Sequence, residues 1–393
     1  MSIARKIKSS ISKSSMIRKM FEEGAQMKKK HGADKVYDFS LGNPNVEPPN
    51  EFKKELIALA HEVIALKHGY APNAGFAETR QAIADKINRT YGLHLTADHV
   101  LMSCGAAGAL NVIFKSILDP EDEVIVPMPY FLEYPFYVDN YRGVVKFVKT
   151  NPDFSLDIKA IGAAINENTK AVLINSPNNP TGKVYSQQNI DDLAKLLTEK
   201  SKELNKIIYL VSDEPYVEIV YDDVVVPGIL KAYKNSIIAY SYSKTLSLPG
   251  ERIGYIAMNP EIEHGADLVN AMILCTRILG YVNAPALMQR IIARLQDARV
   301  DTKIYQKKRD LLCEGLAKAG YKFEKPEGAF YLFVQSPIPD DVAFVKTLLQ
   351  KNILVVPGSG FGGPGYFRIA FCVDDATIIN SLEGFAEAIN DTR

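Results

Sequence analysis

Short apolar runs alternate with longer, helix-like segments through the middle of the chain, and this alternation is the strongest constraint on its fold. The runs are rich in branched and aromatic side chains, which is typical of buried strands. Strands separated by helix-length segments favour a mostly parallel sheet with helices on both faces. We therefore predict a seven-stranded-type α/β sheet from the runs 100–103, 124–126, 144–148, 171–175, 207–211, 237–241 and 253–258.

The sequence pattern changes after about residue 285. A helical pattern over 286–319 is followed by strands at 330–334, 353–356 and 366–372, with a helix near 341–351. This order is typical of a smaller α+β domain. We expect an N-terminal arm that joins the small domain (1–45), a large domain (46–285) and a small C-terminal domain (286–393). Within the arm, residues 17, 20, 21 and 27 predict one apolar helical stripe.

Composition excludes several functional classes. Forty-six basic residues balance forty-six acidic ones, so no net charge directs the protein to nucleic acid or to an anionic membrane. The four cysteines show no CxxC pairing, which indicates buried thiols in a reducing compartment and no metal site. No apolar run approaches the ~20 residues that a membrane span needs. We therefore expect a cytoplasmic protein.

Four residues of chemical interest come directly after predicted strands: Gly105, Asn179, Asp213 and Lys244. Ligands of open α/β sheets bind at the carboxyl ends of the strands. We therefore expect these residues to converge in space.

Lys244 and Asp213 carry the strongest chemical signal, because each ends a run that is almost wholly apolar. A desolvated lysine near another cation, here Arg252, has a lowered pKa and becomes nucleophilic; the alternative is an ordinary solvated lysine. A carboxylate at the end of a buried strand needs a partner. For Asp213 this partner is a helix N-terminus, a core arginine or a protonated pyridine nitrogen. Tyr216 is either a core tyrosine or a hydrogen-bond donor to the same ligand.

The stretch 105–108 consists only of glycine and alanine and opens a helix. Small residues at a helix N-terminus let backbone N–H groups approach a phosphate. Close packing of helix on sheet explains them equally well. A second glycine-rich stretch, 358–362, is interpreted as a turn because no βαβ unit follows it.

Taken in order, these residues suit an aldehyde cofactor with a phosphate and a pyridine ring. The ordered set resembles the class I/II aminotransferases, the aspartate aminotransferase-like enzymes of fold type I that use pyridoxal 5′-phosphate. The resemblance extends from about Asp38 to Cys372. It implies transfer of an amino group between an L-amino acid and a 2-oxo acid by a ping-pong mechanism.

The resemblance also implies roles for single residues. Lys244 bonds to the cofactor aldehyde and moves the proton, Asp213 pairs with the ring nitrogen, and Asn179 and Tyr216 hold the ring oxygen. Phe131 stacks on the ring, with Tyr130 as the alternative register. The phosphate is bound by Ser241, Ser243 and Arg252 and by the 105–107 loop, through the backbone of Gly105, Ala106 and Ala107.

Further matches concern the substrate and the partner subunit. Arg368 matches the arginine that clamps the substrate carboxylate, and Gly42 matches the glycine whose backbone lies over the substrate. Tyr70 matches the tyrosine that reaches the phosphate in the other subunit, which implies a homodimer with shared active sites.

These residues leave the choice of amino acid open. Aspartate or glutamate is favoured, and Arg277 is then the candidate for binding the distal carboxylate, although a helix-surface arginine is an equal alternative. Aromatic or alanine-type substrates remain possible, with Tyr37, Tyr281 and Phe361 as an apolar wall.

Three other functions compete with transamination. The first is another reaction with the same cofactor, such as β-elimination by a C–S lyase, racemisation or decarboxylation. The others are a regulator built on this scaffold and a binding protein with an inactive site. The neutral charge and the short segment before residue 38 disfavour the regulator, and the intact residue set disfavours the inactive protein.

Overall fold

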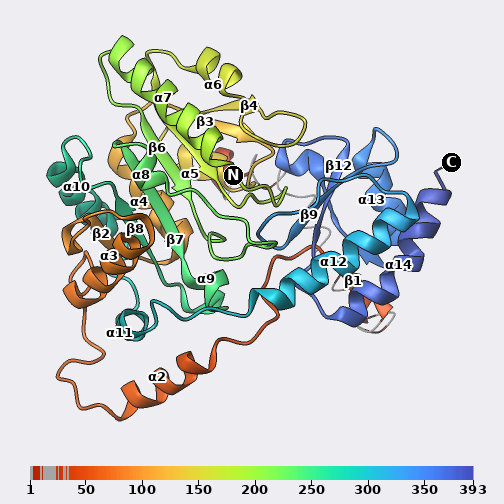
Figure 1. Cartoon of the computed structure of the whole chain (residues 1–393), viewed down its shortest axis with the longest axis horizontal. Helices are drawn as coiled ribbons and strands as arrows, with labels where there is room; N and C mark the ends of the chain where they lie inside the picture. Colours follow the sequence, from red (N-terminus) through yellow and green to blue (C-terminus); the bar gives the residue numbers. More distant parts are fainter. Residues whose placement is uncertain are drawn as a thin grey trace.

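The computed structural model describes residues 3–8, 11, 24, 26–29, 32 and 35–392. The larger part of the chain is built on a seven-stranded sheet, drawn with its helices in Figure 1. Only β8 runs antiparallel to its neighbours, so the prediction of a mostly parallel sheet is confirmed. The strands lie in the order β2 (Val100–Ser103), β8 (Gly254–Met258), β7 (Ser236–Ser241), β6 (Tyr209–Asp213), β5 (Thr169–Asn175), β3 (Glu123–Met128) and β4 (Val144–Lys149).

Both faces of this sheet are buried, which explains the near-continuous apolar runs. In β5, Val172 and Ile174 enter one core, whereas Ala171 and Leu173 enter the other, because successive side chains point to opposite faces. One face packs against α4 (Gly105–Ile117), α5 (Tyr134–Asp139) and α10 (Gly265–Ile278). The opposite core includes α2 (Asn50–His61), α3 (Ala77–Tyr91), α6 (Ile158–Ala164), α7 (Gln187–Glu203), α8 (Ile229–Ala232) and α11 (Ala286–Arg294).

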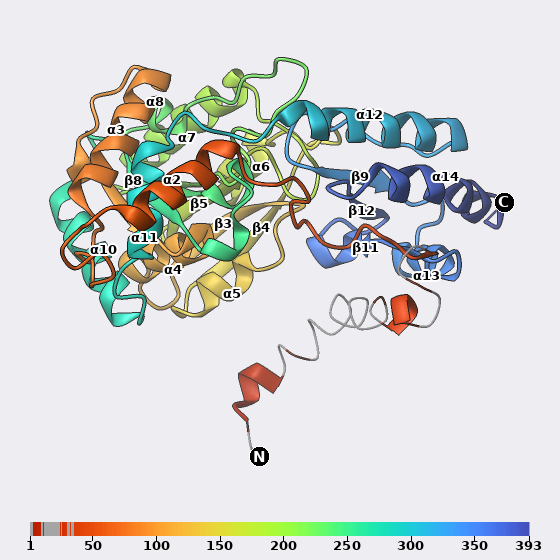
Figure 2. The ribbon, with the colours of Figure 1, turned by 90° about the horizontal axis from the view of Figure 1, so that it is seen from below.

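A smaller part has its own apolar core. Its antiparallel sheet has the order β11 (Val356–Pro357), β12 (Tyr366–Ala370) and β9 (Tyr331–Gln335), and β1 (Tyr37–Asp38) pairs with β10 (Ile353–Leu354). Figure 2 shows this part beside the larger one, with α12 and α14 side by side. The helices are α12 (Thr302–Ala319), α13 (Asp341–Gln350) and α14 (Asp375–Asn390).

Two details of the sequence prediction need correction. The helical pattern over 286–319 is not one helix: α11 ends at Arg294, and α12 begins after Asp301, whose side chain accepts a hydrogen bond from the Lys303 N–H. The predicted strand 353–356 is divided between β10 and β11. The predicted apolar stripe in the arm lies mostly outside the described residues. Within the described ranges, no helix is long and apolar enough to cross a membrane.

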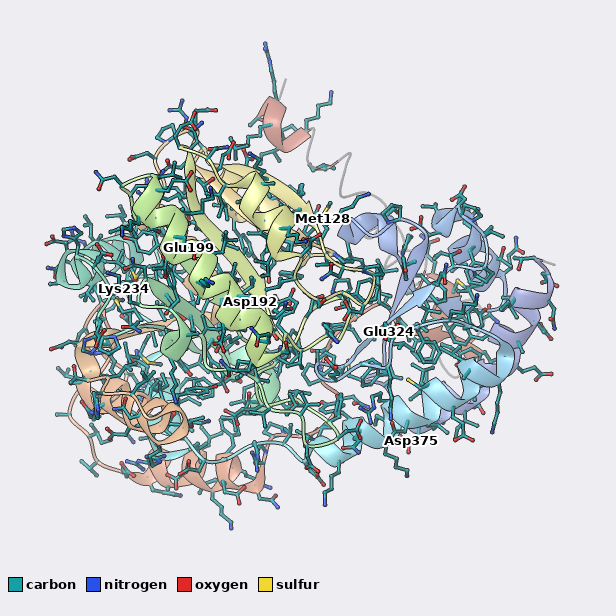
Figure 3. The ribbon with its side chains drawn as sticks, turned by 45° about the horizontal axis from the view of Figure 1, so that its top comes forward. Met128, Asp192, Glu199, Lys234, Glu324 and Asp375 are labelled. Atoms are coloured by element: carbon teal, nitrogen blue, oxygen red, sulfur yellow. The ribbon has the colours of Figure 1, made fainter. Side chains whose placement is uncertain are left out.

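The two parts touch near the carboxyl end of β3. Figure 3 labels Met128 there, with Glu199 and Lys234 on the larger part and Glu324 and Asp375 on the smaller one. A Cβ built on Gly362 would lie 3.0 Å from the Met128 sulfur, so the 358–362 turn packs directly against the end of this strand. The smaller part thus covers the carboxyl end of β3.

Candidate active site

A cavity of about 450 Å³ lies at the carboxyl ends of β5, β6 and β7, between the two parts. Loops after these strands form one wall, and β9, β12 and residues 40–43 form another. The structure therefore brings together most of the residues predicted from the sequence. Those that line the cavity are Gly42, Ala106, Ala107, Phe131, Asn179, Asp213, Tyr216, Ser241, Ser243, Lys244, Arg252 and Arg368.

Lys244 is held where β7 ends. Ser241 is the N-cap of the short helix α9 (Tyr242–Thr245), and its side chain accepts from the Ser243 N–H. The Lys244 amine points into the cavity and donates to the Gly42 carbonyl at 2.8 Å. Burial lowers the pKa of Lys244 to about 8, and the positive charges of Arg252 and Arg368 act in the same direction. The amine therefore has a larger uncharged, nucleophilic fraction near neutral pH than an ordinary lysine.

Asp213 is the last residue of β6 and is 5% exposed. Its Oδ2 accepts a hydrogen bond from the Tyr134 hydroxyl at 2.6 Å. Among the described residues, its Oδ1 has no hydrogen-bond partner. Burial raises the pKa of this carboxyl to about 7. A buried carboxylate oxygen without a partner is costly, so this atom is suited to a cationic N–H donor from a ligand.

Backbone and hydroxyl groups converge near Arg252. Gly105 has a φ of +72°, and a Cβ added there would lie 2.8 Å from the Arg252 Nη2. The N-cap of α4 makes no side-chain hydrogen bond, so the N–H groups of its first turn are available to a ligand. The hydroxyls of Ser241 and Ser243 lie 2.7 Å apart at the same end of the sheet. Together these groups form a seat for an anion with several oxygens.

Arg368 lies on β12 and is 6% exposed. Its Nη1 donates to the Asn179 Oδ1 at 3.0 Å and its Nη2 to the Ser40 carbonyl at 2.7 Å. Its guanidinium carbon lies 4.6 Å from the ring centres of both Tyr331 and Phe361. Burial lowers the pKa of Arg368, and no carboxylate of the described residues forms an ion pair with it. A buried guanidinium that keeps donors free in a cavity is suited to a carboxylate of a ligand.

The two register alternatives for the stacking aromatic lie in different places. Phe131 lines the cavity, whereas Tyr130 stacks on Phe147 with ring centres 4.5 Å apart, which favours Phe131. The expected apolar wall is wrong for the cavity of the single chain: none of Tyr37, Tyr281 and Phe361 lines it.

Two predicted residues lie on the surface of the single chain. Arg277 is on an exposed position of α10, and Tyr70 is 90% exposed. Neither lines the cavity of its own chain.

The sequence prediction missed several residues of the cavity and its support, among them Tyr134, Asn175, Glu133 and Tyr331. Tyr134 binds Asp213, and the Asn175 amide donates to the Asp213 carbonyl at 2.8 Å. Glu133 and Tyr331 also line the cavity. Asn175 was detectable, because it ends a predicted strand at the edge where ligands bind.

These groups fit a pyridoxal 5′-phosphate molecule. The unpaired Asp213 oxygen suits a protonated ring nitrogen, the Lys244 amine suits an aldehyde, and the seat near Arg252 suits a phosphate. Among the described residues, no group of three or more His, Cys, Asp or Glu side chains is placed to hold a metal ion.

Comparison with known proteins agrees with this chemistry. The family model for aminotransferase class I and II matches residues 34–385. An aspartate/prephenate aminotransferase from Thermus thermophilus is 34% identical over 370 residues, which cover 92% of this chain and 92% of the relative. An aspartate aminotransferase from Thermotoga maritima is 30% identical over 369 residues, which cover 92% and 93%.

Solved structures have the same fold. An amino transferase from Eubacterium rectale matches with a TM-score of 0.96 at 41% identity, covering 100% of this chain and 99% of that one. The Thermus thermophilus aspartate aminotransferase with maleate matches with a TM-score of 0.86 at 30% identity, covering 99% and 100%. The resemblance inferred from the sequence is thus confirmed. The chain belongs to the class I and II aminotransferases, which are pyridoxal 5′-phosphate-dependent transferases of fold type I.

Proposed function

We propose that this aminotransferase moves an amino group between an L-amino acid of the aspartate or glutamate type and a 2-oxo acid. The two substrates react in turn at the same site, as in a ping-pong mechanism. The observation that carries the proposal is that one cavity holds the Lys244 amine, the unpaired Asp213 oxygen and the buried Arg368 guanidinium. The names of the relatives support aspartate as the amino donor.

The cofactor would be held by groups at or just after the ends of β2, β3, β5, β6 and β7, together with Arg252. Asp213 would pair with the ring nitrogen, and the Tyr216 hydroxyl and the Asn179 amide would donate to the ring oxygen. Phe131 would cover the ring. Ser241, Ser243, Arg252 and the backbone N–H groups of Gly105, Ala106 and Ala107 would bind the phosphate.

The bound cofactor supplies an aldehyde that takes up the amino group and a ring that accommodates negative charge. Arg368 binds the α-carboxylate of the substrate, while the Gly42 backbone limits its position from above. This fixes the direction of the Cα–H bond before any proton moves. The Lys244 amine would accept the α-proton of the substrate and would later donate a proton to the carbon on the other side of the transferred nitrogen. Asp213 holds the ring nitrogen in its protonated form throughout.

We further propose a homodimer in which Tyr70 reaches the phosphate of the neighbouring site. Tyr70 is 90% exposed and lies near other exposed apolar side chains, Val63 at 102% and Leu66 at 85%. Such a cluster on one segment favours burial against another chain. Arg277, also exposed, is kept as a candidate for the distal carboxylate at the same interface.

The division into an arm (1–45), a large domain (46–285) and a small domain (286–393) is likewise proposed, and so is a cytoplasmic location. Separate apolar cores in the two parts support the division. All four cysteines are free thiols, which supports a reducing compartment.

The test is an absorption spectrum of the purified, cofactor-loaded protein, recorded while single amino acids are added. We expect aspartate or glutamate to convert the absorption band of the cofactor fully in the absence of an oxo acid, and an oxo acid to restore it. Persistence of the band together with release of pyruvate or ammonia would instead establish the C–S lyase alternative. Absence of any cofactor band after reconstitution would contradict the assignment of Lys244.

A further inference from the structure

Tyr331, the first residue of β9, connects groups to which the proposed function gives different tasks. Its hydroxyl lies 3.0 Å from the Tyr216 hydroxyl. The Arg368 guanidinium lies over its ring at 4.6 Å. A Cβ added to Gly42 would lie 1.8 Å from its hydroxyl oxygen, so the Gly42 backbone presses against Tyr331. The side chain is therefore fixed on three sides and is 3% exposed.

The direction of the hydrogen bond between the two hydroxyls follows from their protons. A tyrosine hydroxyl has one hydrogen to donate. If Tyr216 donates to the ring oxygen of the cofactor, its hydrogen is used. The 3.0 Å contact then requires Tyr331 to donate to Tyr216. A donor to the Tyr216 oxygen strengthens the bond that Tyr216 itself donates, because chained hydrogen bonds polarise one another.

Arg368 influences the same two hydrogen bonds, because its charge lies over the ring of Tyr331. Burial raises the pKa of Tyr331 to about 12, while the positive charge of Arg368 lowers it. A neighbouring cation makes a phenol a better donor. A substrate carboxylate bound to Arg368 neutralises this charge and weakens the donation.

We propose that Tyr331 is a positioning residue that transmits occupancy of the Arg368 carboxylate clamp to the Tyr216 hydroxyl at the ring oxygen of the cofactor. This inference rests on the proposed function, in which Arg368 and Tyr216 have these tasks. Binding of a carboxylate at Arg368 weakens the bond from Tyr216 to the ring oxygen, so the bound cofactor keeps its proton to a higher pH. Coupling between the two places is reciprocal.

The experiment compares the loaded wild-type enzyme with Tyr331→Phe. The absorbance of the bound cofactor is titrated with pH, with and without saturating maleate, a dicarboxylate that has no amino group to react. Without maleate, we expect the midpoint of Tyr331→Phe to lie roughly half a pH unit above that of the wild type, since one hydrogen bond is lost. Maleate should raise the wild-type midpoint clearly and the Tyr331→Phe midpoint much less.

Tyr321→Phe is the matched control. Its hydroxyl is also buried and donates to the Phe385 carbonyl at 2.9 Å, but it lies outside the cavity. This variant should keep the wild-type midpoint and the wild-type response to maleate. If Tyr331→Phe had the wild-type midpoint and the wild-type response to maleate, the proposal would be overturned.

Two further results keep the test decisive. In a Tyr216→Phe background the hydroxyl that accepts from Tyr331 is absent. Adding Tyr331→Phe there should change the midpoint neither with nor without maleate. If Tyr331→Phe shifted the midpoint as much as it does in the wild-type background, the coupling would be contradicted. If Tyr331→Phe does not fold, Tyr216→Phe alone should show the reduced response to maleate. If the wild-type protein bound no cofactor, the proposed function itself would be contradicted. This outcome is distinct from a Tyr331→Phe variant that binds the cofactor and titrates like the wild type.

Discussion

Asp213, the last residue of β6, and Glu214, the residue after it, are both buried acids, but they have different surroundings. Asp213 faces the cavity, whereas Glu214 lines a different cavity together with Tyr240 and Tyr255. The two acids are neighbours in sequence, so they point to opposite faces of the sheet. Asp213 therefore serves the proposed cofactor, and Glu214 is a buried acid on the reverse side of the sheet.

The stability of the cofactor-free protein should depend on Glu214. This residue is 6% exposed, and burial raises its pKa from 4.5 to about 8. The folded protein keeps the proton up to about pH 8, whereas the unfolded chain releases it near pH 4.5. The stabilisation is thus complete below pH 4.5 and is lost as the pH rises through 8. Glu214→Gln should raise the free energy of unfolding at pH 8 by about 1–3 kcal/mol and change it little near pH 5.

Urea unfolding at the two pH values measures this difference. Glu199→Gln on the exposed surface of α7 is the control, and it should leave the pH dependence as it is (Figure 3). Equal pH dependence in wild type and Glu214→Gln would show that Glu214 is charged in the folded protein.

Glu133 should influence which amino acid is accepted. Its carboxyl lines the cavity, burial raises its pKa, and no described residue forms a hydrogen bond or ion pair with it. Each cation of the cavity, Lys244, Arg252 and Arg368, already has a proposed partner. Glu133→Gln removes a negative charge, so kcat/KM for aspartate relative to alanine should rise roughly tenfold.

Half-reaction rates with the two amino acids give this ratio. Glu133→Asp keeps the charge and is the control, which should show the wild-type ratio. An unchanged ratio in Glu133→Gln would exclude Glu133 from substrate discrimination.

At the scale of elements, the N-terminus of α4 depends on a residue without a side chain. Gly105 combines a φ of +72° with a Cβ position 2.8 Å from the Arg252 Nη2. Gly92, the C-cap of α3, has a φ of +68°, but a Cβ there meets nothing within 4 Å. Comparing alanine variants of Gly105 and Gly92 therefore distinguishes the effect of backbone strain from that of the collision with Arg252.

Alanine at either glycine should lower the free energy of unfolding by about 1–2 kcal/mol, because both need a left-handed backbone. Only Gly105→Ala should also weaken binding of pyridoxal 5′-phosphate, since the Arg252 guanidinium must move. Denaturant unfolding and cofactor titration by fluorescence measure the two effects. Equal cofactor affinity in both variants would show that the collision does not disturb the phosphate seat.

The strands of the large sheet were predictable because burial on both faces leaves a continuous apolar signal. The break between α11 and α12 was not, because the helical pattern continues through it and the chain bends there for tertiary reasons. The Asp301 cap was the only local signal. Within the site, the positions of Lys244 and Asp213 at strand ends were predictable from the apolar runs before them, whereas Arg368 was singled out only by the family resemblance. The contact of Tyr331 with Tyr216 was not, because it joins residues 115 positions apart, from the two parts of the fold.

At the scale of the whole molecule, the site is assembled from parts that are distant in sequence. Residues 40–43 line the cavity together with Lys244 and Arg368. The Lys244 amine donates a hydrogen bond to the Gly42 carbonyl, 202 positions earlier in the chain. Such a site is complete only when both parts of the chain are folded. The proposed contribution of Tyr70 extends the same principle to a second chain.

Hybrids of the proposed homodimer test whether Tyr70 acts across the subunit interface. Lys244→Ala dimers should be inactive, and Tyr70→Phe dimers should bind the cofactor roughly tenfold more weakly through loss of one hydrogen bond. If Tyr70 serves the neighbouring site, a hybrid has one site with both Lys244 and Tyr70 intact and one site with neither. Mixing the variants after mild dissociation should therefore restore up to half of the wild-type activity per hybrid at limiting cofactor. If Tyr70 acts within its own chain, no hybrid site is intact and mixing restores nothing.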